Sequence, residues 1–249
     1  DLAKGATIWT LTLENFNATM SFGIYKDQVQ LFHGTNLLSV DAFSGKILKQ
    51  VSLVNNVSVC RWKQSKPTHS LETLKKSKTR NITQTSNLLV GKWNYFRNYT
   101  LPLLGRVNVE TNDVEYLELP LQLSRMPGLE DQFLWFDPNQ KKIETQTVVP
   151  NSMTNSRGFV VFGDKRSKGS GWGHIAAPSP TISGDNLYVP VMNGTVYVLN
   201  WNTETLDEKS IVAINDLGLA GQAYTRASLS FSNGHVFAHT LRELICIGQ

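Results

Sequence analysis

The segment from Gly163 to His174, GDKRSKGSGWGH, holds residue types that can bind an anion. Glycines let successive backbone N–H groups converge on one point, and neighbouring cations add attraction for a phosphate or carboxylate. The spacing matches no phosphate-loop motif and therefore favours a solvated loop. His174 alone is typical of a hydrogen-bonded structural histidine. The candidate ligand-binding residues are Lys165, Arg166, Lys168, Trp172 and His174.

The histidine spacing in the sequence predicts no metal site. His235 and His239 have the spacing of a helical metal pair, but the residues between them alternate like a strand. Four residues of strand span about 13 Å, too far for two ligands of one ion. His33 and His69 have no neighbouring ligand in the sequence. We therefore predict no metal ligand and no catalytic residue.

Acidic residues and nucleophile motifs lead to the same prediction. A pair of carboxylates could support glycoside chemistry. The acids concerned lie near turn signals, which is typical of solvated turn residues: Glu130, Asp131, Asp207, Glu208 and Asp216. No G-x-S-x-G nucleophile motif is present.

The two cysteines, Cys60 and Cys246, lie far apart in the sequence. Their separation permits one long-range disulfide, but they form neither a disulfide framework nor a C-x-x-C motif. The sequence leaves open whether they pair.

The net charge of +4 is concentrated in one segment. Residues 61–80 carry seven basic side chains and one acid, Glu72, so the remainder of the chain is slightly acidic. A surface that coats nucleic acid is therefore not predicted. We predict a basic insertion loop over 61–80 with a short helical turn at Ser70–Leu74, which could dock an acidic partner through interactions that salt weakens.

Length and composition indicate one globular domain over 1–249. No run of residues is long and apolar enough for a membrane-spanning helix, so no transmembrane segment is predicted. The opening DLAKGATIW lacks the features of a signal peptide. Either the chain is cytoplasmic, or an export signal lies outside this sequence.

Period-two alternation in short runs, separated by Gly, Asn, Asp and Ser, predicts antiparallel strands joined by tight turns. The hairpin with the strongest turn signal spans Asn186–Asn200, where Asn193-Gly194 favours the positive φ angles of a two-residue turn. Similar units span Val29–Asp41, with a following strand ILKQVSL, Gly105–Leu119, and the segment after Asn233-Gly234. Such repeated units favour a β-propeller of four-stranded antiparallel blades, with a β-sandwich as the alternative.

The repeat resembles that of the PQQ-like (pyrroloquinoline-quinone-like, quinoprotein-type, BamB-like) propeller family, whose consensus is roughly AxDxxTGKxxW. Residues Ser39–Lys46, SVDAFSGK, match it, although Lys49 replaces the tryptophan. Gly5–Trp9, GATIW, resembles the second half of the motif. Residues 91–110 and 157–248 look like the C-terminal part of PQQ-like proteins of planctomycete and verrucomicrobial type.

The resemblance implies blades of about 40 to 50 residues, so this length holds five or six blades where the family has seven or eight. We interpret the chain as the C-terminal part of a longer propeller that begins within a blade, the alternative being a small complete propeller.

The resemblance also implies an exported, periplasmic or cell-envelope protein. Our first hypothesis is a noncatalytic scaffold that binds a protein partner or joins a larger assembly, with no cofactor. The second is a quinone-dependent oxidoreductase with PQQ and Ca²⁺, for which the family's adjacent cysteines are lacking. A weaker third is carbohydrate binding on an aromatic face.

Overall fold

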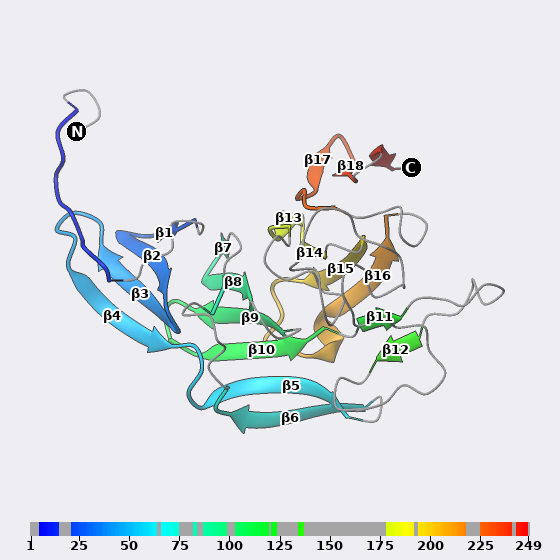
Figure 1. The fold of residues 1–249 in the computed structure, drawn as a ribbon, viewed down its shortest axis with the longest axis horizontal. Coiled ribbons are helices and arrows are strands. Elements are labelled where there is room, and N and C mark those ends of the chain that lie inside the picture. Colours follow the sequence, from blue (N-terminus) through cyan, green and yellow to red (C-terminus); the bar gives the residue numbers. More distant parts are fainter. Residues whose placement is uncertain are drawn as a thin grey trace.

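A computed structural model describes most of the chain outside a long central gap. The described residues are 5–14, 21–63, 66–74, 82–83, 87–98, 103–119, 121–123, 134–136, 178–191, 194–217, 225–240 and 243–248. Nearly all regular structure in these ranges consists of short strands (Figure 1). No helix in them is long and apolar enough to cross a membrane.

Sheet 1 is a four-stranded antiparallel meander close to the N-terminus. Its strands are β1 (Gly23–Tyr25), β2 (Gln28–His33), β3 (Asn36–Asp41) and β4 (Ile47–Ser52). The tight turns need left-handed backbone, and glycine supplies it at Gly34 (φ 60°) and Gly45 (φ 72°). The β2–β3 hairpin predicted from the sequence is confirmed.

Sheet 2 combines a second meander with an added hairpin. The meander consists of β7 (Leu88–Val90), β8 (Trp93–Arg97), β9 (Leu103–Asn108) and β10 (Val114–Glu118). The hairpin of β5 (Val57–Lys63) and β6 (Lys66–Glu72) joins this meander through β5, which pairs in parallel with β10. It thereby covers the outer edge of the meander, an edge that would otherwise expose unpaired backbone groups.

Sheets 3 and 4 complete the array. Sheet 3 is an antiparallel meander of β13 (Thr181–Ser183), β14 (Asn186–Pro190), β15 (Thr195–Asn200) and β16 (Ile211–Asp216). A one-turn 3₁₀ helix, η2 (Glu208–Ser210), precedes β16. Sheet 4 has three strands, β17 (Ser230–Ser232), β18 (His235–His239) and β19 (Leu244–Ile247), and a separate pair is formed by β11 (Leu121–Leu123) and β12 (Leu134–Phe136).

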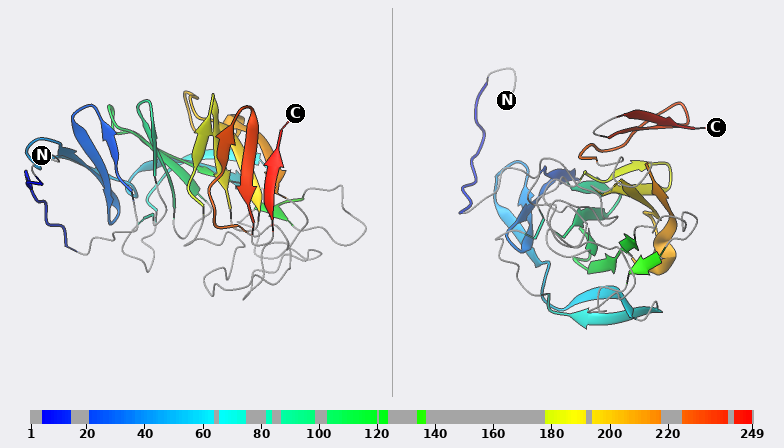
Figure 2. Two further views of the ribbon diagram at one scale, coloured as in Figure 1. Left: turned by 90° about the horizontal axis from the view of Figure 1, so that it is seen from above. Right: turned by 45° about the vertical axis from the view of Figure 1, so that its right-hand side comes forward.

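The four sheets stack face to face in chain order, and three apolar cores lie between them. Phe32 and Leu37 of sheet 1 share the first core with Phe96 and Tyr116 of sheet 2. The second core joins sheets 2 and 3, and the third joins sheets 3 and 4. Figure 2 shows the sheets side by side like blades, with sheets 1 and 4 at opposite ends. Each pair of neighbouring sheets buries apolar side chains between its facing surfaces.

The predicted fold class is confirmed: the protein is all-β and contains four-stranded antiparallel meanders that stack as propeller blades do. The sandwich alternative is wrong, because four sheets stack in series. The predicted hairpins at Asn186–Asn200 and Gly105–Leu119 and after Asn233-Gly234 are also present.

The basic segment 61–80 differs from the loop predicted for it. Residues 61–63 and 66–72 belong to the paired strands β5 and β6, so the helical turn expected at Ser70–Leu74 does not form. Pairing with β5 outweighs the weak local helical preference. Residues 75–80 lie outside the described ranges.

Candidate functional site

The predicted anion-binding residues Lys165, Arg166, Lys168, Trp172 and His174 all lie outside the described residues, as do Glu130 and Asp131. Their role stays a prediction. His235 and His239 lie on a strand, as expected, four residues apart at the two ends of β18. The ring of His33 hydrogen-bonds the backbone oxygen of Glu14 (2.7 Å).

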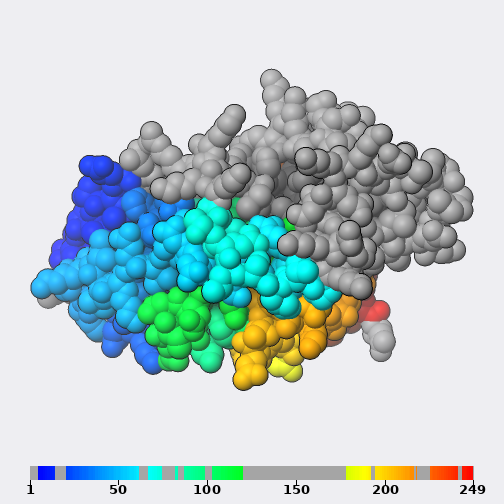
Figure 3. Space-filling view, turned by 90° about the horizontal axis from the view of Figure 1, so that it is seen from below, coloured from blue at the N-terminus to red at the C-terminus, as the bar shows by residue number. Residues whose placement is uncertain are grey.

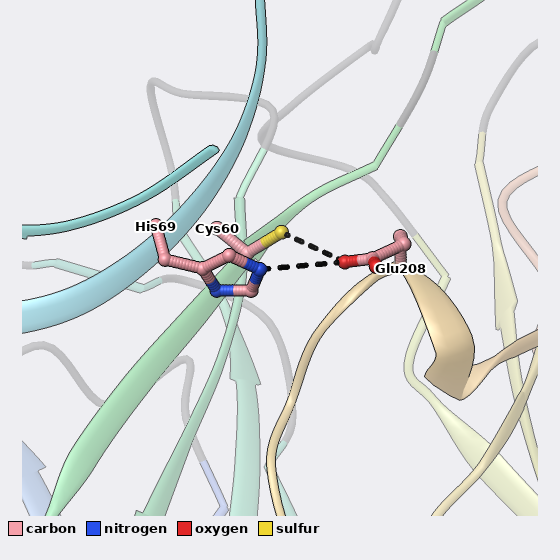
Figure 4. Close-up of side chains that lie close together, drawn as sticks. All are labelled: Cys60, His69 and Glu208. Atoms are coloured by element: carbon pink, nitrogen blue, oxygen red, sulfur yellow. Dashed lines mark hydrogen bonds and ion pairs between the residues drawn. The ribbon is translucent and has the colours of Figure 1, made fainter. Parts of the chain in front are cut away.

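Three residues from distant parts of the sequence converge in a cluster, here called the Cys60 cluster: Cys60, His69 and Glu208. The Cys60 thiol donates a hydrogen bond to Glu208 Oε2 (3.6 Å), and His69 Nε2 lies 3.5 Å from the same oxygen. The three potential ligand atoms lie within 4.8 Å of one another. Figure 4 shows both side chains of the hairpin directed at the carboxylate.

Strand pairing positions the first two members of the cluster. Cys60 on β5 and His69 on β6 are direct cross-strand partners in the antiparallel hairpin. Opposite residues of such a pair project from the same face with their Cβ atoms about 5 Å apart. Hairpin formation alone therefore brings the thiol and the imidazole together.

The start of η2 positions the third member. Asp207 caps this 3₁₀ helix by accepting a hydrogen bond from the Lys209 N–H (2.9 Å), and the Ser210 hydroxyl accepts one from the Asp207 N–H (3.2 Å). This reciprocal capping box fixes the turn. Glu208 is its first helical residue and faces the hairpin across the sheet 2–sheet 3 boundary.

The electrostatic surroundings disfavour a free thiolate. Burial raises the pKa of the Cys60 thiol to about 12, and the nearby carboxylates of Glu208 and Asp207 contribute to the rise. The thiol is 2% exposed, whereas the His69 side chain is 56% exposed. The cluster is thus closed on the Cys60 side and open to solvent at His69. Sulfur, imidazole nitrogen and carboxylate oxygen are the donor types that bind Zn²⁺ in proteins.

Sequence reasoning missed this cluster because Glu208 lies 148 residues from Cys60. The nine-residue spacing of Cys60 and His69 becomes informative only once the hairpin and its register are known. Its position near turn signals predicts Glu208 to be a solvated turn acid, whereas the structure places it in the cluster. The two cysteines do not pair: Cys60 is buried and free, and Cys246 is exposed and free.

A second polar arrangement ties sheet 2 to sheet 3 through the fully buried Arg106. Its Nε donates to Glu115 (2.6 Å), and its two Nη atoms donate to the backbone oxygens of Thr203 (2.9 Å) and Glu204 (3.1 Å). The guanidinium lies 3.6 Å from the ring centre of Trp93. The contacts with Glu115 and Trp93 lie within sheet 2, and those with Thr203 and Glu204 reach the segment that follows β15 of sheet 3, so we assign Arg106 a structural role.

The segment that resembles the PQQ-like repeat forms a capped turn. Asp41 accepts hydrogen bonds from the Ser44 N–H and hydroxyl (both 2.7 Å). The Trp9 indole donates to the backbone oxygen of Ala42 (2.9 Å), and its ring packs on Gly45 so closely that an added Cβ would lie 2.7 Å from it. Trp9 thereby anchors the N-terminal segment 5–14 to sheet 1.

The outer face of sheet 1 carries an apolar hollow of about 610 Å³. It is bounded by the N-terminal segment and by strands β2 and β3, and its lining residues are Trp9, Leu11, Thr12, Leu13, Phe22, Val29, Leu31 and Val40. Around it, Phe22 and Ile24 are 63% and 56% exposed. The opposite face of the same sheet buries Phe32 and Leu37 completely or nearly so.

No family model and no curated protein matches the chain. Among solved structures, the computationally designed Ika4 protein aligns over 98% of both chains, with 9% identity and a TM-score of 0.47. BamB from Moraxella catarrhalis aligns over 90% of this chain and 70% of its own, with 12% identity and a TM-score of 0.27. The designed Ika8 protein gives a TM-score of 0.23. Likenesses this weak carry no argument about function.

Proposed function

We propose that this protein is a noncatalytic propeller-type scaffold that binds a protein partner through the outer face of sheet 1. The exposed apolar surface around Phe22 and Ile24 carries this proposal. Between sheets 1 and 4 the facing apolar surfaces are buried in the three cores. Sheet 4, at the other end of the stack, also exposes Leu244, but the described hollow lies on sheet 1. A contiguous apolar patch at the end of such a stack suits an apolar surface of another protein.

The chemistry of the face indicates the kind of partner. The side chains that bound the hollow are aliphatic or aromatic, apart from Thr12. Such a surface can pack against the apolar face of another sheet. Sheet 2 packs in this way against the opposite face of sheet 1. The partner is therefore expected to present a sheet or strand with alternating apolar residues.

A photo-cross-linking amino acid at Phe22 tests this proposal directly. The matched control is Val212 on β16, which is 59% exposed on another sheet. We expect irradiation of cells expressing the full chain to give one defined adduct with a second protein from position 22 and none from 212. Adducts confined to the same polypeptide, or equal labelling from both positions, would contradict the proposal.

Substitution provides the complementary test. Ile24→Asp places a charge on the outer face without touching a core, and should abolish the adduct formed from position 22 while the protein stays folded by circular dichroism. Val212→Asp should leave that adduct unchanged.

The compartment is also part of the proposal. The resemblance of Ser39–Lys46 to the PQQ-like repeat supports an exported, periplasmic or cell-envelope assembly. Cell fractionation should place the protein with envelope or secreted material, and recovery only from the cytoplasm would contradict that location.

The scaffold needs no quinone. Mixing the purified protein with PQQ and Ca²⁺ and then desalting should leave no visible chromophore on the protein, because no observation in the described residues points to a quinone site. A stable bound chromophore would instead favour the quinone-dependent oxidoreductase.

A further inference from the structure

We propose that the Cys60 cluster binds one divalent transition-metal ion, for which Zn²⁺ is the best chemical match, and thereby links the β5–β6 hairpin to sheet 3. The proposal is independent of the partner-binding face, which lies on sheet 1. Its ligands are Cys60 Sγ, His69 Nε2 and a carboxylate oxygen of Glu208.

The two distances from the Glu208 oxygen to the other ligand atoms match those around a tetrahedral ion. With Zn–S bonds of about 2.3 Å and Zn–N or Zn–O bonds of about 2.0 Å, tetrahedral angles separate sulfur from oxygen by about 3.6 Å and nitrogen from oxygen by about 3.3 Å. The observed separations are 3.6 Å for Cys60 Sγ to Glu208 Oε2 and 3.5 Å for His69 Nε2 to the same oxygen. The third separation, between Cys60 Sγ and His69 Nε2, is within 4.8 Å, so coordination needs these two atoms to close on the same ion.

The supporting elements hold this geometry on two sides. Cys60 and His69 are fixed by the register of a seven-pair hairpin, and Glu208 by the capped start of η2. In addition, Arg61 on the hairpin pairs with Glu72 (2.9 Å) and with Glu118 of β10 (3.2 Å), which attaches the hairpin to the meander of sheet 2. Figure 3 shows the hairpin on the molecular surface between sheet 1 and sheet 3.

The donor set selects the class of ion. One thiolate, one imidazole and one carboxylate suit Zn²⁺ and its spectroscopic substitute Co²⁺, whereas Mg²⁺ and Ca²⁺ prefer oxygen ligands alone. Three protein ligands leave a fourth position, and the half-exposed His69 marks the side from which water or a small anion would fill it. Such an ion would join two segments 148 residues apart.

Titration of the metal-free full chain with Co²⁺ tests the proposal. Thiolate coordination gives an intense sulfur-to-Co²⁺ charge-transfer band, and tetrahedral geometry gives strong visible bands. We expect both at one equivalent of Co²⁺, with displacement by Zn²⁺. Cys60→Ser should remove the charge-transfer band, and His69→Gln or Glu208→Gln should weaken binding by about tenfold or more. Cys246→Ser and His235→Gln are the matched controls and should change nothing.

X-ray absorption of the Zn²⁺-loaded wild type identifies the metal ligands without relying on a variant that could misfold. The expected first shell is one sulfur at about 2.3 Å and three nitrogen or oxygen atoms near 2.0 Å. Absence of the sulfur, absence of the charge-transfer band, or loss of that band in Cys246→Ser alone would overturn it. The cluster would then be only a hydrogen-bonded thiol with a His69–Glu208 ion pair.

Discussion

The two cysteines of this protein occupy opposite environments. Cys60 is buried beside Glu208, and its pKa is raised to about 12, whereas Cys246 is exposed on β19. Since the thiolate is the reactive form, protonation and burial both protect Cys60 at neutral pH.

Alkylation of the metal-free protein with iodoacetamide at neutral pH should therefore modify Cys246 at least tenfold faster than Cys60. Peptide mass spectrometry with time measures both rates, and denatured protein serves as the control in which the difference should disappear. Equal rates in the folded protein would contradict the buried position of Cys60.

Asp41 makes the stability of sheet 1 depend on pH. Hydrogen bonds from the Ser44 hydroxyl and N–H lower the pKa of its carboxyl group in the folded state. A folded pKa below the unfolded value, which is about 3.9, means that the stabilisation is present above that value and is lost as pH falls through the folded pKa.

Asp41→Asn keeps an acceptor but removes the charge. In urea unfolding from about pH 6 to about pH 3, the wild type should lose more stability on acidification than Asp41→Asn does. If both lose the same amount, the carboxylate of Asp41 does not contribute in this way.

At the scale of single residues, sequence patterns predicted turns better than sites. Asn233 and Gly234 adopt the positive φ angles expected of their hairpin turn, 49° and 77°. The Cys60 cluster was missed, because its members meet only through hairpin register and the packing of sheet 2 on sheet 3. A site assembled by tertiary contacts leaves no local pattern in the chain.

At the level of elements, Arg106 adds polar contacts to the apolar core between sheet 2 and sheet 3. Its guanidinium reaches the backbone of the β15–η2 connection while pairing with Glu115 on β10. Removing one partner of a buried ion pair costs about 3–5 kcal/mol, since the other charge stays behind.

Arg106→Ala should accordingly lower the free energy of unfolding by about 3–5 kcal/mol in urea titration. The exposed Arg226 is the control, and Arg226→Ala should stay within about 0.5 kcal/mol of the wild type. A loss below about 1 kcal/mol for Arg106→Ala would mean that this contact does not hold the two sheets together.

Element prediction succeeded where alternation and turn residues agreed, as in β2–β3 and β14–β15. It failed for β6, because charge dominates the composition of 61–80 and hides a strand whose partner is β5. Local sequence patterns also do not predict the parallel pairing of β5 with β10, because that pairing joins residues more than 50 positions apart.

For the whole molecule, the stacking of four sheets one after another accounts for both the buried cores and the proposed binding surface. Each inner sheet packs against two neighbours, while the outer face of sheet 1 keeps exposed apolar side chains around its hollow. The sequence predicted blades that cover one another, but not which face would stay uncovered, because that depends on the order of the stack.

The most direct test of the account is hydrogen exchange of the full chain, alone and bound to the protein captured from position 22. We predict that binding slows exchange in peptides covering β1 to β4 of sheet 1 and leaves β14 and β15 of sheet 3 unchanged. Slowed exchange confined to sheet 3, or none in sheet 1, would contradict the claim that the outer face of sheet 1 is the binding surface.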